Sequence, residues 1–182
     1  MTDPGQSALD AGPFSAWLAS MTAALGGEAD ADVPCDGCTA CCTAAQFVTI
    51  GPDETETIAH VPKALRFPAP GRPGHFVLGY DERGHCPLLV EGGCSIYEHR
   101  PRACRTYDCR IFPAAGVAID EPGRRRLALR VERWRFSYDD PDDRQGHDAV
   151  RAAARHFRDQ ARNATELAVL AVEHYEQFRN VG

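Results

Sequence analysis

The chain has 182 residues, 43% hydrophobic and 25% charged, as in an ordinary globular protein with room for one domain of usual size. Its formal net charge is −6, so bulk electrostatics do not favour nucleic acid as a partner. The first residues, MTDPGQSALDAG, lack the basic start and apolar run of a signal peptide, and no stretch reaches the roughly 18 apolar residues of a membrane span, so we expect a cytoplasmic protein with no membrane contact.

The first predicted element is a helix over residues 13–25. Its apolar side chains recur at the spacing of one helical face, namely Phe14, Trp17, Leu18, Met21 and Leu25. Pro13 suits the first turn, and Gly26–Gly27 is expected to end the helix. We interpret it as a helix that packs on the domain, with a partner-binding helix as the alternative. A polar linker over 28–34 follows.

The elements predicted next are short. In chain order they are a strand over Phe47–Ile50, a helix through His60 with Asp53 as its cap, a proline-rich loop over 61–75, and a hairpin of Phe76–Tyr80 with Cys86–Val90 around Asp81–Gly84. Glu91–Gly93 is a further predicted turn, which leads to Cys94–Tyr97.

The last third of the chain is predicted to hold a basic strand and a helical segment. Apolar residues alternate along Arg124–Tyr138, with a change of phase near residue 132 that suggests a bulge. Its six arginines indicate a solvated strand face, with an anion-binding face as the alternative. Residues 139–143 are a predicted turn, and helix is expected from about 147 to 179, either unbroken or divided at 163–165.

These elements predict a small α+β fold. We expect a loop-rich, cysteine-rich metal-centred core over 35–110 with few short strands. It is packed by the N-terminal helix and linker of residues 1–34 and by the basic strand and C-terminal helices of 111–182. The whole is expected to form a single compact domain.

Eight cysteines lie within one stretch of the chain, at positions Cys35, Cys38, Cys41, Cys42, Cys86, Cys94, Cys104 and Cys109. Cysteines in a reducing compartment stay as thiols, so a cluster of this kind indicates metal ligands or redox chemistry. Disulfides remain an alternative that needs an oxidising compartment. Eight cysteines suffice for two four-sulfur sites, although the number alone does not require two.

The first four cysteines carry the stronger signal. Cys35, Cys38 and Cys41 are separated by two-residue gaps, which let a tight turn aim thiolates at one metal. Gly37 gives the first gap backbone freedom. Cys41 and Cys42 are adjacent, so in an extended chain they would face opposite sides, as one ligand and one core thiol or as ligands of two centres.

The later cysteines are spaced more widely, but two cations flank them. Arg100 and Arg105 would stabilise thiolates and offset the negative charge of a four-thiolate site, so they are predicted to be cofactor-binding residues. The alternative for Arg100 is an ion pair with Glu98 or Asp108. Four-sulfur ligation suits zinc and an iron–sulfur cluster equally well.

The order and spacing of these residues resemble a known family. Cys35-x2-Cys38-x2-Cys41-Cys42, then Cys86-Pro-Leu-Leu, then Cys94-x-Ile-Tyr97-x2-Arg100-Pro101-x2-Cys104-Arg105 resemble the YkgJ-type cysteine-cluster family over roughly residues 35–110. The resemblance implies zinc or iron chelation by the seven cysteines from Cys35 to Cys104, with Cys109 at a less fixed position. The flagellin lysine methylase carries a similar cluster, associated with an iron–sulfur centre, so the resemblance also implies redox or methyl-transfer chemistry as an alternative.

Other sites compete weakly with this interpretation. His85 and His99 are candidates to replace a cysteine as ligand. A single cysteine–histidine nucleophile pair would leave seven cysteines unexplained, and no acid/base pair identifies a catalytic residue. We therefore predict a metal-binding protein. The alternatives are an enzyme that takes a small anionic substrate, a metal storage or delivery protein, and a module with a protein partner.

Overall fold

The computed structural model describes residues 7–31, 33–35, 37–91 and 93–179, and the α+β prediction is confirmed. The chain divides into two compact units. The helical unit comprises Met1–Asp32, Asp108–Asp120 and Ala128–Gly182. The cysteine-rich unit comprises Val33–Tyr107 and Glu121–Leu127. None of the helices in the described ranges is long and apolar enough to cross a membrane.

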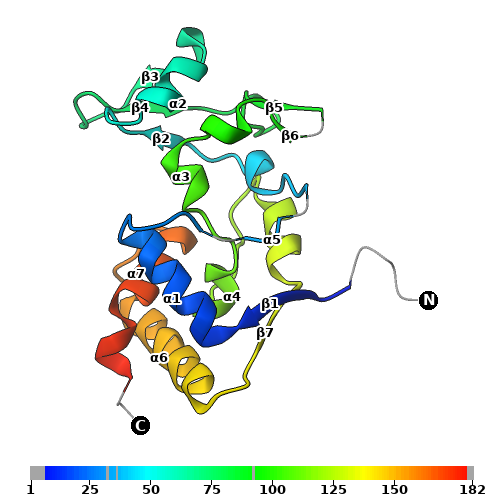
Figure 1. The fold of residues 1–182 in the computed structure, drawn as a ribbon, viewed down its shortest axis with the longest axis vertical. Helices are drawn as coiled ribbons and strands as arrows, with labels where there is room; N and C mark the ends of the chain where they lie inside the picture. The colour runs from blue at the N-terminus through cyan, green and yellow to red at the C-terminus, as the bar shows by residue number, and fades with distance from the viewer. Residues whose placement is uncertain (1–6, 32, 36, 92, 180–182) are drawn as a thin grey trace. The chain divides into compact units, whose positions relative to one another are not determined.

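The helical unit is built around a group of packed helices. Figure 1 shows α1 (Phe14–Leu25), α6 (Pro141–Phe157) and α7 (Ala164–His174) beside one another, with the short α4 (Ile111–Ala115) among them. The predicted helix over 13–25 is therefore confirmed. Four of its five predicted apolar residues are buried, namely Phe14, Trp17, Leu18 and Met21.

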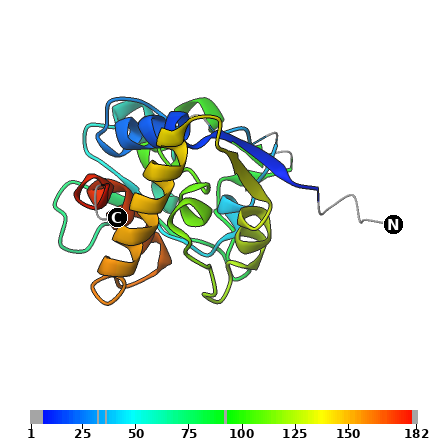
Figure 2. The same ribbon diagram turned by 90° about the horizontal axis from the view of Figure 1, so that it is seen from below.

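A two-stranded parallel sheet completes the helical unit. Figure 2 shows β1 (Leu9–Pro13) running along β7 (Trp134–Ser137). In the register of this pair Leu9 lies opposite Trp134, with a shift between Asp10 and Gly12. Pro13 thus ends β1 and precedes α1, as its fixed φ favours. The strands tie the N-terminal helix to the segment that leads into α6.

The C-terminal helical segment is divided, because two polar side chains cap separate helices. The predicted turn over 139–143 is the start of α6, where Asp140 and Asp143 form a capping box and Pro141 takes the first helical position. Asn163 caps α7 by accepting a hydrogen bond from the Glu166 amide at 3.0 Å. Of the two predicted alternatives, the divided segment is confirmed, although α6 ends at Phe157 and α7 begins at Ala164, so the break lies at 158–163 and not at 163–165.

The cap of α6 gives a testable stability contribution. Asp140→Ala removes the acceptor of the Asp142 amide, at 2.9 Å, and should lower the free energy of unfolding of the helical unit by about 0.5–2 kcal/mol. Urea unfolding followed by tryptophan fluorescence measures this change. Asp140→Asn keeps a capping oxygen and should remain close to wild type, so an equal loss in both variants would contradict the capping role.

The basic strand predicted over Arg124–Tyr138 is wrong in its first half. Arg125–Val131 forms helix α5, and only Trp134–Ser137 is a strand. Leu127 and Val131 are buried at the i, i+4 spacing of a helical face, whereas Leu129, which alternates with them, is 52% exposed. The change of phase near residue 132 therefore marks a helix-to-strand junction instead of a bulge.

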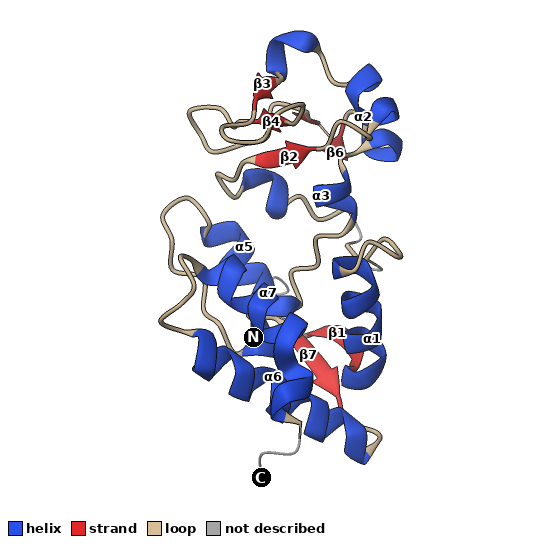
Figure 3. Ribbon diagram, turned by 90° about the vertical axis from the view of Figure 1, so that its left-hand side faces the viewer, coloured by secondary structure: helices blue, strands red, loops and turns tan. Residues whose placement is uncertain are grey.

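The cysteine-rich unit has two small antiparallel sheets. Figure 3 shows β2 (Val48–Ile50), β4 (Phe76–Leu78) and β3 (Phe67–Pro68), with β4 in the centre. The second sheet pairs β5 (Leu89–Val90) with β6 (Gly93–Cys94). The unit also contains two short helices, α2 (Thr55–His60) between β2 and β3, and α3 (Arg102–Arg105) after β6. Buried apolar residues form the core of this unit, namely Val48, Ile50, Val61, Leu78 and Leu88.

The predicted hairpin between Phe76–Tyr80 and Cys86–Val90 is wrong. β4 pairs with β2 and β3 instead, so β3 is a strand within the predicted loop 61–75. Residues 81–85 fold into a closed turn, because the Asp81 carboxylate accepts hydrogen bonds from the Arg83 and His85 amides, each at 2.9 Å. This turn leads the chain away from β4 toward the first group of cysteines.

The predicted cap of the helix that ends at His60 is also wrong. Glu54, and not Asp53, is the residue before α2, and its side chain makes no cap hydrogen bond there. The Glu54 carboxylate instead accepts hydrogen bonds from the Gly51 and Arg102 amides, and Asp53 pairs with the Arg102 side chain. Two acidic residues therefore hold the start of α3 against the loop that follows β2.

Candidate metal centre

Backbone hydrogen bonds bring the first and second cysteine groups together. Cys41–Thr43 forms a 3₁₀ turn, and the Cys42 carbonyl accepts a hydrogen bond from the Cys86 amide at 2.7 Å. The Cys86 carbonyl in turn accepts from the Leu89 amide at 3.0 Å, which opens β5. Cysteines 44 positions apart in the sequence thus lie in adjacent segments.

The β5–β6 pair then places Cys94 beside the same segment. Cys94 lies opposite Leu89 in the register of the two strands, and the Ser95 amide donates to the Leu88 carbonyl at 2.9 Å. Cys86 and Cys94 are both partly buried and pack against the apolar core of the cysteine-rich unit. Their sulfurs are therefore held by the fold and not by flexible loops alone.

Cys104 enters from α3, which Pro101 precedes. The Cys104 amide donates to the Pro101 carbonyl at 2.8 Å, and α3 packs against β2. The residue is exposed as a whole, but enough protein atoms surround its sulfur that burial raises the pKa of the Cys104 thiol to about 12. Negative charge on three other cysteines acts in the same direction, namely Cys41, Cys86 and Cys94.

The pKa of the Cys86 thiol is raised for the same reasons. Burial raises the pKa of its thiol first, and negative charge on Cys94 and Cys41 raises it further. Negative charge on Cys41 and Cys94 therefore disfavours the ionisation of both Cys86 and Cys104, as like charges do. A bound cation would reverse this effect, because thiolates are the form that ligates metal. The group of Cys41, Cys86, Cys94 and Cys104 is called the thiol group below.

Cys41 and Cys42 do not face opposite sides as they would in an extended chain. They lie in a 3₁₀ turn, with their sulfurs 4.0 Å apart. The hydrogen bond with Cys42 raises the pKa of the Cys41 thiol strongly, and burial adds to this. The expectation of opposite faces fails because it assumed an extended backbone.

The spacing of the sulfurs separates two kinds of metal centre. When four sulfurs bind one zinc ion tetrahedrally, each about 2.3 Å from the metal, any two of the sulfurs lie about 3.8 Å apart. Among the described residues, the cysteines provide no set of three sulfurs that all lie within 4.8 Å of one another. The thiol group is thus close enough for electrostatic coupling but spread more widely than one ion requires.

Cys35 and Cys38 lie on a turn at the start of the cysteine-rich unit. The Cys38 amide donates to the Cys35 carbonyl at 2.8 Å, and Gly37 has a φ of +74°, a conformation that favours glycine. The tight turn expected from the two-residue gap is therefore present. Cys35 is exposed and Cys38 half-buried.

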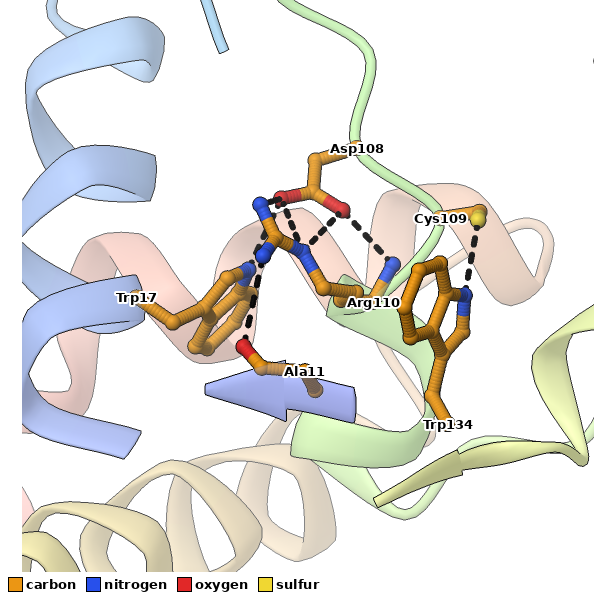
Figure 4. A network of polar contacts seen from close by, with 6 residues as sticks. All are labelled: Ala11, Trp17, Asp108, Cys109, Arg110 and Trp134. Atoms are coloured by element: carbon orange, nitrogen blue, oxygen red, sulfur yellow. Dashed lines mark hydrogen bonds and ion pairs between the residues drawn. The ribbon is translucent and has the colours of Figure 1, made fainter. Parts of the chain in front are cut away.

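Cys109 belongs to the helical unit, apart from the unit that holds the other seven cysteines. Figure 4 shows its sulfur accepting a hydrogen bond from the Trp134 indole at 3.2 Å. Beside it, the buried Asp108 forms an ion pair with Arg110 at 2.8 Å and accepts from the Trp17 indole at 2.8 Å. Sequence reasoning missed this network, because Trp17 and Trp134 lie far along the chain from the consecutive residues 108–110.

The two predicted cofactor-binding arginines are engaged with the backbone. Arg100 donates to the Tyr97 carbonyl at 2.8 Å and lies over the Tyr97 ring, 4.1 Å from its centroid. Arg105 donates to the Arg100 carbonyl at 2.8 Å. The positive charge of Arg100 lowers the pKa of Cys104, although burial and the neighbouring thiolates outweigh it. Arg100 therefore favours the thiolate form in this unit.

The comparisons with known proteins identify the motif. A family model described as "CxxCxxCC: Putative zinc- or iron-chelating domain" matches residues 34–125, about half of the chain. The match covers the thiol group together with Cys35, Cys38, Cys42 and Cys109. No curated protein and no solved structure was found to match.

Proposed function

Since the chain belongs to the CxxCxxCC family of zinc- or iron-chelating domains, we propose that its thiol group holds an iron–sulfur cluster. The observation that carries this proposal is the convergence of these cysteines in the fold, in which negative charge on Cys41 and Cys94 raises the pKa of the Cys86 thiol and contributes to the raised pKa of Cys104. Charge on neighbouring thiolates makes the Cys86 and Cys104 thiols harder to ionise, and a bound cationic centre would remove this effect.

The choice of a cluster over a single zinc ion rests on the sulfur spacing. The cysteines offer no three sulfurs within 4.8 Å of one another among the described residues, whereas four ligands of one zinc ion lie about 3.8 Å apart. A cluster contains several metals, each with its own thiolate, so its ligands are spread more widely. Zinc is the second candidate, because the family description includes both metals.

The surroundings of the thiol group suit a bound cluster. Cys86 and Cys94 pack against apolar residues, and Arg100 supplies a positive charge near Cys104. Burial and nearby charge are among the properties that set the reduction potential of such a centre. An iron–sulfur cluster supplies one-electron redox chemistry when bound. Cysteines must stay reduced to ligate a cluster. We therefore propose a reducing compartment for the protein, such as the cytoplasm.

The other cysteines of the unit are candidates to line the same metal centre. Cys35, Cys38 and Cys42 share the motif with Cys41, and Cys42 lies 4.0 Å from Cys41 between sulfurs. We propose that they line the same metal-binding region, and we do not include them in the thiol group. Cys109, a predicted ligand that lies in the helical unit and accepts a hydrogen bond from Trp134, is left out of this region.

Analysis of the anaerobically purified protein tests the proposal. We expect a brown protein that contains iron and acid-labile sulfide in equal amounts. A colourless protein with tightly bound zinc would overturn the cluster assignment and leave metal binding intact. A protein that takes up neither metal, with its thiols free or oxidised, would overturn metal binding altogether.

A further inference from the structure

A second group of metal-ligating side chains lies in the cysteine-rich unit and contains no cysteine. One ligand atom each from Glu56, His60 and His99 lies within 4.8 Å of the other two. Glu56 and His60 are four residues apart on α2, so they share one helical face. His99 ends the 3₁₀ turn Tyr97–His99, which packs against α2.

The tautomer of His60 is fixed in the form that binds metal. Its Nδ1 lies 2.8 Å from the Glu56 carbonyl oxygen. A carbonyl only accepts hydrogen bonds, so Nδ1 carries the proton and Nε2 keeps its lone pair. Metal-ligating histidines characteristically donate their other ring nitrogen to a carbonyl or carboxylate in this way.

The second imidazole lies directly on the first. The rings of His60 and His99 stack with centroids 3.6 Å apart and an angle of 8° between their planes. Rings stacked in this way keep their nitrogen lone pairs in two separate parallel planes, so one ring must turn about its side-chain torsions before both face one ion. Glu56 and His60 are exposed and His99 is half-buried, which leaves room for that turn.

We propose that Glu56, His60 and His99 form a second metal site, for a divalent first-row transition ion such as Zn²⁺. Two imidazoles and one carboxylate are a donor set that zinc and ferrous iron use in proteins. Three protein ligands leave coordination positions open to water or to a small ligand. None of the donors is a cysteine, so the site shares no ligand with the thiol group.

Calorimetric titration of Zn²⁺ into the purified protein, with its cysteine-bound metal already in place, tests this site. We expect wild type to bind one further ion. Loss of an outer-shell partner costs about 10–100-fold in affinity, so His60→Gln or Glu56→Gln should weaken binding by at least about a hundredfold. The double variant His60→Gln/His99→Gln should bind no further ion.

His75→Gln is the matched control, because His75 lies in the same unit but outside the group. It should bind the further ion as wild type does. All variants should retain the metal held by cysteine, so failure here is distinguishable from failure of the thiol group. A wild-type protein that binds no further ion, or a double variant that binds it equally well, would overturn the second site.

Discussion

Replacing Cys86 with serine should release the bound metal and unfold the cysteine-rich unit. Structural zinc contributes about 10–16 kcal/mol to the folding of zinc-finger peptides, and a metal centre of comparable strength would match the usual total stability of about 5–15 kcal/mol. Cys86 lies at the centre of the arrangement, because its backbone bonds to Cys42 and its thiol couples to Cys94 and Cys41. Metal analysis and amide hydrogen exchange of residues 33–107 measure the two effects.

Two internal controls separate this effect from general unfolding. Both tryptophans of the chain, Trp17 and Trp134, lie in the helical unit, so their fluorescence reports that unit and should change little. Cys109→Ser makes the same sulfur-to-oxygen change outside the thiol group, and that variant should retain the metal bound there. Equal loss of this metal in both variants would contradict the ligand assignment.

Asp108→Ala should destabilise the helical unit by about 3–5 kcal/mol. The change removes the carboxylate of a buried ion pair and leaves the Arg110 guanidinium, 9% exposed, in the interior. It also takes away the acceptor of the Trp17 indole N–H. Part of the cost is the desolvation of these donors, which water cannot reach once the carboxylate is gone.

Urea unfolding followed by tryptophan fluorescence measures the loss, since Trp17 lies within the network. Asp159→Ala makes the same change at an exposed position of the helical unit and should alter stability by no more than about 0.5 kcal/mol. Similar midpoints for the two variants would show that the Asp108 ion pair contributes no more than a surface carboxylate.

Several features of this protein were predictable because they are local. The spacing of Phe14, Trp17 and Met21 reproduces one face of α1, since burial on a helix repeats with the helical period. The two-residue gap of Cys35 and Cys38 forms its turn for a similarly local reason. The cysteine motif also predicts zinc or iron chelation, which the family match supports in general terms.

Predictions that depended on pairing between distant segments failed. The alternation of Leu127, Leu129 and Val131 resembles a strand, but burial of only the first and last fits a helix followed by β7. Phe76–Leu78 pairs with β2 and β3 because the Asp81 turn directs the following residues elsewhere. Strand propensity is a statement about burial and neighbours, so it does not select the partner strand.

The sequence by itself determined that eight cysteines cluster between positions 35 and 109. It also determined that the chain binds metal as a member of its family. Only the tertiary structure decided which cysteines lie near one another. Cys86, Cys94 and Cys104 reach Cys41 through the β5–β6 pair and α3, and Cys109 lies in the other unit. Spacing along the chain fixes local turns, whereas contacts across tens of residues depend on how strands pair and where the apolar core forms.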